Sequence, residues 1–492
     1  MSVVILMLAT VVQRSIGFGR GVLFCRWLSP EMLGQWEMAY SFLLLFAPLA
    51  VLGIPGSYGR YLEHYRQRGH LRTFLRRTTV WTAVCSVGSI GLLLVFAPQF
   101  SELVFGSSQN VTGIYAVAAC MVAVIVHHTL TSLLTALRLF RVVSIMNFLQ
   151  SLLFAGSALA LITQEASLIS IVGSYGVACL IASLVAIVWV WPGLRSSETS
   201  TEAIPHIAFW SRLLRFAFFV WVTNLLSHLF ALVDRTMILH CGGMDPTVAL
   251  EQVGHYHSSR IVPLLLVSFA DLLSGLIMPH LSHDWEVGHR ELVGRQINLS
   301  VKIMGLGMHA VGICVLLAGP FLFNSIFQGK YSDGLAVLPW TLAGCVISGI
   351  YVVAQNYLWC AEHPRLAAVP LGLGLGLNVL LNFILIPAWG LHGAVLATAV
   401  STAVCLAALL ILSQRQGMQL DPGSWATIIL PIGLGLGILP ALVGLGMVVL
   451  LAVSTPWMLS EWERNQASEF LSNGTAKLKN MFPKLLPARN GL

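Results

Sequence analysis

Three arginines, Arg14, Arg20 and Arg260, lie inside long apolar segments of the sequence. A charge at the depth of a bilayer costs about 2.5–3.5 kcal/mol on insertion scales, so a residue of this kind is usually functional. Guanidinium is permanently charged and donates hydrogen bonds in a fork that matches phosphate. The three arginines are therefore candidate ligands of an anionic molecule. Alternatively, they pair with an acidic residue such as Glu37 and hold helices together.

Two acidic residues, Asp234 and Asp271, also fall within apolar segments. Either could bind a coupling proton or cation, but we expect Asp234 to be an ion-pair partner of Arg235 or Arg260. Arg26 and Arg235 lie near the ends of predicted helices, where long side chains extend to the membrane surface.

The first apolar segment carries Arg14 and Arg20 and no acidic residue. Six residues at 100° each place these two arginines about 120° apart on an ideal helix. Gly17, Gly19 and Gly21 could let the helix bend. Exporters of cationic drugs usually need a buried carboxylate, so its absence from this segment favours an anionic substrate.

The composition is that of a membrane protein. The 492 residues are 57% hydrophobic and 10% charged, with a mean hydropathy of +0.82, whereas soluble domains carry about 25% charged residues. The net charge of +7 does not indicate nucleic acid as a partner, because the basic residues lie between the apolar blocks. The nine cysteines are scattered singly, which predicts neither disulfides nor a zinc site. We expect no metal, no cofactor and no cleavable signal peptide, although the true start could lie upstream of Met1.

Apolar blocks of about 20 residues, the length that spans a bilayer, fill nearly the whole chain. They predict an all-α polytopic protein with helices near 3–27, 35–56, 78–98, 111–137, 144–163, 168–192, 212–240, 253–279, 298–322, 335–360, 366–387 and 391–413. The last block, 425–459, is too long for one span, and we expect two short helices broken near Pro440. The total is fourteen spans, with thirteen as the alternative. Prolines at 48, 263 and 370 should kink or break their spans.

Basic residues predict the orientation. With a cytoplasmic N-terminus, 21 of the 27 lysines and arginines fall in inside loops or the tail, and only Lys330 falls in an outside loop. Both termini are then cytoplasmic. The segment 58–77 is rich in arginine, and we expect a topogenic signal and a helix on anionic lipid. The alternative is a basic surface through which a phosphorylated headgroup enters, formed by Arg60, Arg66, Arg68 and Arg72.

Two short motifs recur at nearly one offset. Leu-Gly-Gln-Trp at 33–36 matches Val-Gly-His-Tyr at 253–256, 220 residues later. Gly-Ser-Tyr-Gly-Val-Ala at 173–178 matches Gly-Leu-His-Gly-Ala-Val at 390–395, 217 residues later. Six-helix halves of one orientation, related by a pseudo-two-fold axis along the membrane normal, would explain both matches. We expect an N-lobe at 1–205, a C-lobe at 206–413, a C-terminal helix pair at 414–459 and a cytoplasmic tail at 460–492.

Four stretches of the sequence resemble a known family. Three of them are 28–34, then 233–235 followed by 253–256, and 382–398, which begins Asn-Phe-Ile-Leu-Ile-Pro and carries the strongest likeness. The fourth, 13–20, is similar to helix one of the lipid II flippases. Together they resemble the polysaccharide-transport branch, the O-antigen (Wzx-type) flippases, of the multidrug/oligosaccharidyl-lipid/polysaccharide exporter (MOP) superfamily. The likeness spans residues 1 to about 413.

The resemblance implies a two-lobed flippase that works by alternating access in the bacterial cytoplasmic membrane. Its cargo would be an undecaprenyl-diphosphate-linked oligosaccharide, a repeat unit for surface polysaccharide. Arg14, Arg20 and Arg260 would line the cavity and bind the diphosphate. Membrane lipids, and polysaccharide polymerases or glycosyltransferases, would be its partners.

Two rival functions remain open. A MATE-like drug or cation antiporter would share the fold, and its transport would depend on carboxylates rather than on Arg14 and Arg20. An O-antigen ligase or membrane glycosyltransferase would need a large outside loop, and the predicted outside loops are short. The sequence contains no nucleophile with a positioned base, so we expect a transporter and not an enzyme.

Overall fold

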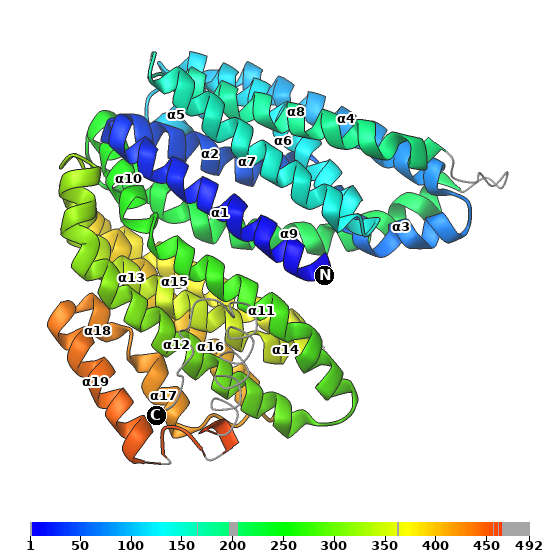
Figure 1. The fold of residues 1–492 in the computed structure, drawn as a ribbon. Helices are drawn as coiled ribbons and strands as arrows, with labels where there is room; N and C mark the ends of the chain where they lie inside the picture. Colours follow the sequence, from blue (N-terminus) through cyan, green and yellow to red (C-terminus); the bar gives the residue numbers. More distant parts are fainter. Residues whose placement is uncertain are drawn as a thin grey trace, which may run out of the picture.

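The computed structural model describes residues 2–164, 166–195, 205–361, 364–455, 457–460 and 462–464, and all regular secondary structure in these residues is helical. The predicted all-α class is therefore confirmed. Most of the predicted tail, residues 465–492, lies outside the described residues, and so do residues 196–204, which precede the predicted lobe boundary at 205–206. The helices form two bundles with α9 and α10 along the boundary between them (Figure 1).

The N-terminal bundle consists of the first eight α-helices and a short 3-10 helix. A sharp turn separates the first two helices, where Ser29 caps the second by accepting a hydrogen bond from Met32 N at 3.2 Å, directly before Pro30. The elements are α1 (Ser2–Trp27), α2 (Pro30–Ala50), η1 (Ile54–Ser57), α3 (Tyr58–Gln67), α4 (Leu71–Val95), α5 (Ala97–Phe105), α6 (Val111–Ala136), α7 (Phe140–Ile162) and α8 (Leu168–Arg195).

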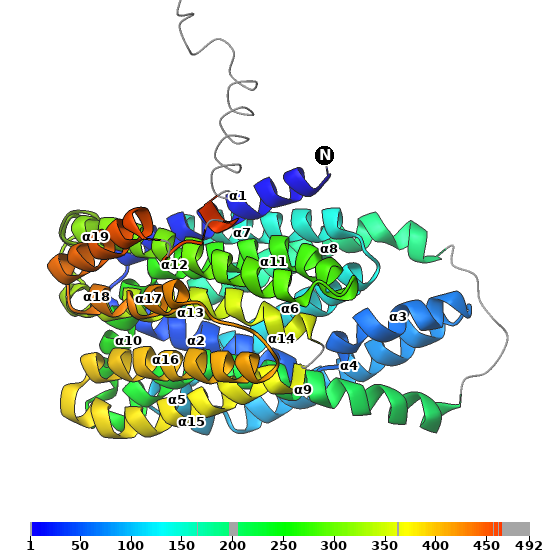
Figure 2. The same ribbon diagram turned by 90° about the horizontal axis from the view of Figure 1, so that it is seen from below.

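The C-terminal bundle runs from the ninth to the sixteenth α-helix, and three short helices lie against its side (Figure 2). The bundle contains α9 (His206–Cys241), α10 (Pro246–Arg260), α11 (Pro263–Glu286), α12 (Arg290–Phe321), η2 (Leu322–Ile326), α13 (Ser332–Ala354), α14 (Asn356–Cys360), α15 (Pro364–Trp389) and α16 (Leu391–Arg415). The short helices are α17 (Pro422–Ile429), α18 (Ile432–Gly435) and α19 (Ile438–Ser454).

Within the described residues, nine helices are long and apolar enough to cross a membrane. A tenth span results if α2 and the bent η1–α3 segment, which meet at 64°, are counted together. Helix α1, with its three arginines, is not among them. The number fourteen therefore stays a prediction, whereas the polytopic membrane architecture is confirmed.

Two predicted helices are broken where proline or glycine interrupts them. The span predicted at 253–279 is two helices, because Pro263 has no N–H to donate and the chain turns at residues 261–262. In the last apolar stretch the break precedes α19 at Gly437, whose φ of +114° suits glycine. Pro440 is the third residue of α19, where the missing N–H has no intrahelical acceptor to lose.

The C-terminal short helices are tied to the bundle by a buried ion cluster. Lys302 lies within α12 and is 1% exposed. Its Nζ lies 2.7 Å from Asp421 Oδ2 and 2.8 Å from Glu463 Oε1. Asp421 also caps α17 by accepting from Ser424 N at 2.7 Å. The cluster therefore joins the segments before and after α17–α19 to one point on α12.

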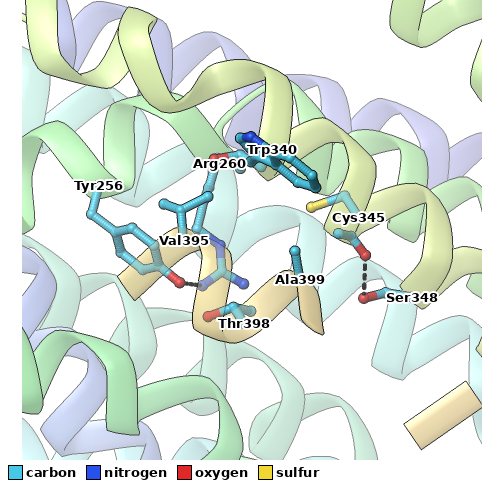
Figure 3. A pocket seen from close by; sticks show the side chains of 10 residues that line it. Tyr256, Arg260, Trp340, Cys345, Ser348, Val395, Thr398 and Ala399 are labelled. Atoms are coloured by element: carbon cyan, nitrogen blue, oxygen red, sulfur yellow. Dashed lines mark hydrogen bonds between the residues drawn. The ribbon is translucent and has the colours of Figure 1, made fainter. Parts of the chain in front are cut away.

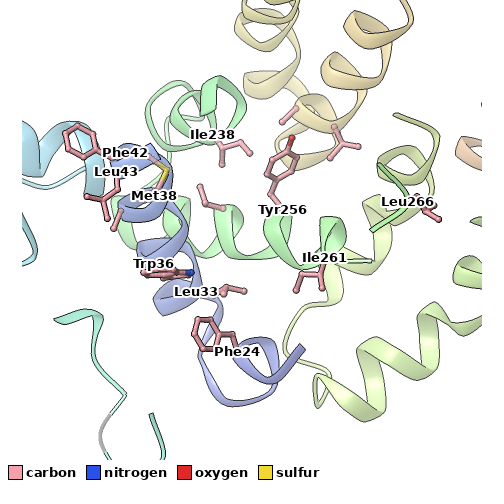
Figure 4. Packing of buried hydrophobic residues seen from close by; sticks show 14 of the residues in the cluster. Phe24, Leu33, Trp36, Met38, Phe42, Leu43, Ile238, Tyr256, Ile261 and Leu266 are labelled. Atoms are coloured by element: carbon pink, nitrogen blue, oxygen red, sulfur yellow. The ribbon is translucent and has the colours of Figure 1, made fainter. Parts of the chain in front are cut away.

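The two bundles meet closely at α2 and α10, the helices that contain the repeated motif. A Cβ added to Gly34 would overlap the carbonyl oxygen of Leu250, and a Cβ added to Gly254 would overlap that of Pro30. Each of the two repeat glycines thus lies against a backbone carbonyl of the other helix. We call this close approach the α2–α10 contact. Buried side chains from α1, α2, α9 and α10 form one core across it (Figure 4).

Substitution at the α2–α10 contact should destabilise the protein. We expect Gly34→Ala to lower the unfolding temperature, because the overlap with a backbone oxygen forces the helices apart at a typical overpacking cost of about 1–3 kcal/mol. Gly91→Ala in α4 is the matched control, since a Cβ there meets open space. Thermal unfolding of the detergent-purified proteins gives the comparison, and equal unfolding temperatures for the two variants would contradict the close contact.

Candidate functional site

A cavity of about 320 Å³ lies between the two bundles and is lined by α1, α2, α9, α10 and α11. We call it the central cavity. Its lining contains three arginines, Arg14, Arg20 and Arg235, and one carboxylate, Glu37. Three positive charges against one negative charge leave the described lining at +2, with His257 counted as neutral. A cleft with one dominant sign of charge concentrates ligands of the opposite sign, so the central cavity suits an anion.

Helix α1 turns a wide face to the central cavity. Arg14 and Arg20 lie at its two edges, as the angle of about 120° between them requires, and Gly17 and Gly21 lie between them. Gly17 faces open space, whereas the side chain of Ile261 lies against Gly21. The sequence suggested that a bend in α1 could bring the two arginines together. In the structure both arginines line the same cavity because the cavity is wide.

Arg14 and Arg20, the two arginines of α1 that line the central cavity, form no ion pair with any described residue. The Nη1 atom of Arg14 is buried and has no hydrogen-bond partner among the described residues. The Cζ atom of Arg20 lies 4.3 Å from the centroid of the Phe154 ring, and within the described chain its guanidinium forms no ion pair. A buried donor without a partner is costly, and a bound anion would satisfy it.

Arg235, in contrast, binds the N-terminal bundle through both of its Nη atoms, although its Nε has no hydrogen-bond partner among the described residues. Its Nη2 lies 3.2 Å from Glu37 Oε2, and its Nη1 donates to Ser41 Oγ at 2.7 Å. His257 Nδ1 lies 3.0 Å from the same Glu37 oxygen. The sequence placed Arg235 at the membrane surface or beside Asp234. The structure instead makes it part of an ion cluster, Glu37–Arg235–His257, that joins α2 to α9 and α10.

Asp234 points away from this ion cluster and into the C-terminal bundle, because successive residues of a helix lie about 100° apart. It is 1% exposed and accepts hydrogen bonds from Tyr256 Oη at 2.6 Å, Thr398 Oγ1 at 2.6 Å and Asn382 Nδ2 at 2.9 Å. Arg260 Nη1 donates to the same Tyr256 oxygen at 2.7 Å. The predicted pairing of Asp234 with Arg260 thus runs through a tyrosine.

Arg260 does not line the central cavity with Arg14 and Arg20. It lines a separate pocket of about 30 Å³ inside the C-terminal bundle, between Tyr256, Trp340 and Thr398 (Figure 3). Arg260 and Tyr256 are four residues apart and therefore share one face of α10, and this face is turned to α13 and α16. The expectation that all three arginines share one cavity is therefore corrected for Arg260.

The remaining predicted residues lie outside the central cavity. Asp271 is exposed on α11. The arginines of the proposed basic surface are all exposed, whereas the opposite face of α3 is buried through Tyr58, Tyr61, Leu62 and Tyr65. An amphipathic surface helix is thus present, and the basic residues on or beside it are Arg60, Arg66, Arg68 and Arg72.

Sequence reasoning gave little weight to Glu37 and His257, although a signal was available. Each directly follows one copy of the repeated motif, and the offset of 220 residues that relates the motifs also relates Glu37 to His257. Equivalent residues on helices that pack together meet near the axis that relates them. Their contact at 3.0 Å is such a meeting.

Comparisons with known proteins agree with this architecture. The family described as polysaccharide biosynthesis protein matches residues 1–279. The lipid II flippase MurJ of Bacillus subtilis is 22% identical over 442 residues, which cover 80% of this chain and 78% of the flippase. The uncharacterized membrane protein YabM of the same organism is 23% identical over 410 residues, which cover 78% of this chain and 74% of YabM. The probable low-salt glycan biosynthesis flippase Agl15 of Haloferax volcanii is 24% identical over 152 residues, 31% of this chain and 32% of Agl15.

Solved structures show the same fold. The inward closed conformation of lipid II flippase MurJ superposes with a TM-score of 0.71 at 13% identity, over 94% of this chain and all of that one. An inward-facing MATE-family multidrug transporter of the MOP superfamily gives a TM-score of 0.65 at 12% identity, over 82% of this chain and 94% of that one. The relatives that carry an assigned activity are flippases and transporters, not enzymes. Because the family match covers more than half of the sequence, the chain belongs to the polysaccharide biosynthesis protein family, and it shares the fold of these lipid II flippase and MATE transporter structures.

Proposed function

We propose that this protein is a flippase for a lipid-linked, diphosphate-bearing oligosaccharide, an undecaprenyl-diphosphate-linked repeat unit of surface polysaccharide. The observation that carries the proposal is the pair of uncommitted guanidinium groups, Arg14 and Arg20, in a cavity of net positive charge between two bundles. Relatives named lipid II flippase and glycan biosynthesis flippase support the class of cargo.

The cargo binds through its charged group. A diphosphate accepts charge-assisted hydrogen bonds from both guanidinium groups, which are stronger than neutral ones. The sugars occupy the aqueous space between the bundles, and the lipid tail stays in the bilayer. Arg260 is not a cargo ligand in this proposal. Together with Asp234 it holds α9, α10, α15 and α16 in place.

Alternating access requires that the two bundles separate on one side and close on the other. The Glu37–Arg235–His257 cluster links the bundles beside the α2–α10 contact. Opening the cavity between these helices breaks the cluster and leaves Glu37 without its partners. The cluster thus favours the closed state and limits how often the protein opens without cargo.

The basic residues support a cytoplasmic N-terminus in the cytoplasmic membrane. Lys330 donates to the carbonyl oxygen of Arg26 at 2.8 Å, so the one lysine predicted outside lies at the end of the molecule where α1 ends. The arginine-rich helix α3 lies at the opposite end (Figure 1). That end would face the cytoplasm, where membrane-bound glycosyltransferases complete the cargo, and a polymerase would receive it outside.

The fold also favours a second candidate function, a MATE-like drug or cation antiporter. A cationic substrate needs an available carboxylate in the cavity. In the described lining, Glu37 is already paired with Arg235 and His257, and Asp234 is enclosed elsewhere by three hydrogen bonds. The charge of the central cavity therefore favours the flippase. A ligase or glycosyltransferase has no such structural support.

Loss of either uncommitted guanidinium should abolish transport. We expect Arg20→Gln and Arg14→Gln to fail to restore surface polysaccharide in a flippase-null strain, because each removes half of the diphosphate site. Arg26→Gln, at the exposed end of the same helix, is the matched control and should complement. Immunoblots of membranes show whether each variant inserts. Normal polysaccharide with Arg20→Gln would remove this residue from the mechanism.

Neutralising Glu37 should loosen the contact between the bundles. Cys25, which is fully buried beside α2, serves as a reporter in a variant whose other eight cysteines are replaced. We expect Glu37→Gln to raise labelling of Cys25 by a membrane-impermeant maleimide several-fold, because an amide holds Arg235 less strongly than a carboxylate does. Glu31→Gln in the first turn of α2 is the control. Unchanged protection of Cys25 would show that the cluster does not hold the bundles together.

A further inference from the structure

Arg20 rests on an aromatic surface instead of a carboxylate. Its Cζ atom lies 4.3 Å from the ring centroid of Phe154 in α7 and 5.9 Å from that of Phe24. A cation over an aromatic face is attracted by about 0.5–2 kcal/mol, and most strongly where water is excluded. Phe154 is therefore the main partner of this guanidinium within the N-terminal bundle.

An aromatic partner leaves the charge and the hydrogen-bond donors of an arginine available, whereas an acidic partner does not. The Glu37 carboxylate engages Nη2 of Arg235 and cancels its charge. A phenylalanine ring has no lone pairs and no charge, so Arg20 keeps its five N–H donors and its full positive charge. Phe154 therefore holds the guanidinium in place without competing with an anion for it.

The ring itself is held rigidly. Phe154 is 1% exposed, and its centroid lies 5.3 Å from that of Trp36, 5.1 Å from Tyr175 and 6.1 Å from Phe24. These residues come from α1, α2, α7 and α8, so the cluster joins four helices of one bundle. Trp36 and Phe24 also line the central cavity. Arg20 is thereby fixed to the N-terminal bundle and directed into the cavity.

We propose that Phe154 is a positioning residue, which orients Arg20 as a ligand of the cargo diphosphate. The proposal rests on the proposed function, because it assigns Phe154 a role only if Arg20 binds the cargo. It adds a residue that does not line the central cavity and that carries no charge.

A double-mutant cycle with farnesyl diphosphate, a soluble prenyl diphosphate, tests the proposal. Binding to the full-length protein in detergent is measured by calorimetry for the unmodified chain, Phe154→Leu, Arg20→Gln and the double variant. We expect Phe154→Leu to weaken binding about tenfold, which corresponds to the upper part of the cation–π range. In the Arg20→Gln background the same change should have no effect, because the group that it positions is gone. Phe154→Tyr keeps the ring and should bind within about twofold of the unmodified chain.

Controls separate the possible failures. Phe24→Leu removes a ring that lies 5.9 Å from Arg20, and it should weaken binding less than Phe154→Leu does. If Phe154→Leu does not fold, Phe154→Met, whose flexible unbranched side chain fills irregular gaps, replaces it in the cycle. An equal loss of affinity in both backgrounds, or no loss in either, would overturn the positioning role. If Arg20→Gln itself leaves binding unchanged, the proposed function fails instead.

Discussion

The architecture depends on the close approach of two helices that occupy equivalent places in the two halves of the chain. At α2 and α10, Gly34 and Gly254 each face a backbone carbonyl of the other helix, and no side chain fits between them. Small residues allow helices in a membrane to approach in this way. Beside this contact α1 diverges from α11, and the central cavity lies in the space between them. The cavity is lined by residues of both of these helices, so the contact fixes its position.

The buried charged residues are arranged around the same contact between α2 and α10. Glu37 and His257 follow the two glycines by three residues and lie 3.0 Å apart, and Glu37 also pairs with Arg235. Asp234, the residue before Arg235, is enclosed within the C-terminal bundle and linked to Arg260 through Tyr256. Each of these charges thus contributes to packing within or between bundles. Arg14 and Arg20 are different, because no carboxylate pairs with them in the described chain, and the positive charge of the cavity comes from them.

Much of the fold follows from the sequence, because helices in a membrane must satisfy their own backbone hydrogen bonds and are therefore long and apolar. The repeat of Gly34 and Gly254 predicted a two-fold arrangement, and the structure shows these residues in contact. The sequence predicted a kink or a break at Pro263, but it could not show which of the two occurs or which pocket Arg260 faces, since both depend on the surrounding helices. Hydropathy likewise gave no sign that Arg235 faces one bundle and Asp234 the other. That difference depends on which surfaces surround α9, and only the packed structure defines them. The Phe154 partner of Arg20 was equally hidden, because the two residues are far apart in the sequence.

The central claim is that Arg14 and Arg20 together bind the diphosphate of the cargo while the protein moves it across the membrane. The most direct measurement is the flipping of a fluorescent, short-chain lipid diphosphate sugar in proteoliposomes, with a lipid sugar that lacks phosphate as comparison. The account predicts that the unmodified protein moves the diphosphate lipid and not the neutral one, and that the Arg14→Gln/Arg20→Gln variant moves neither. Equal flipping of both lipids, or full activity of the double variant, would contradict it.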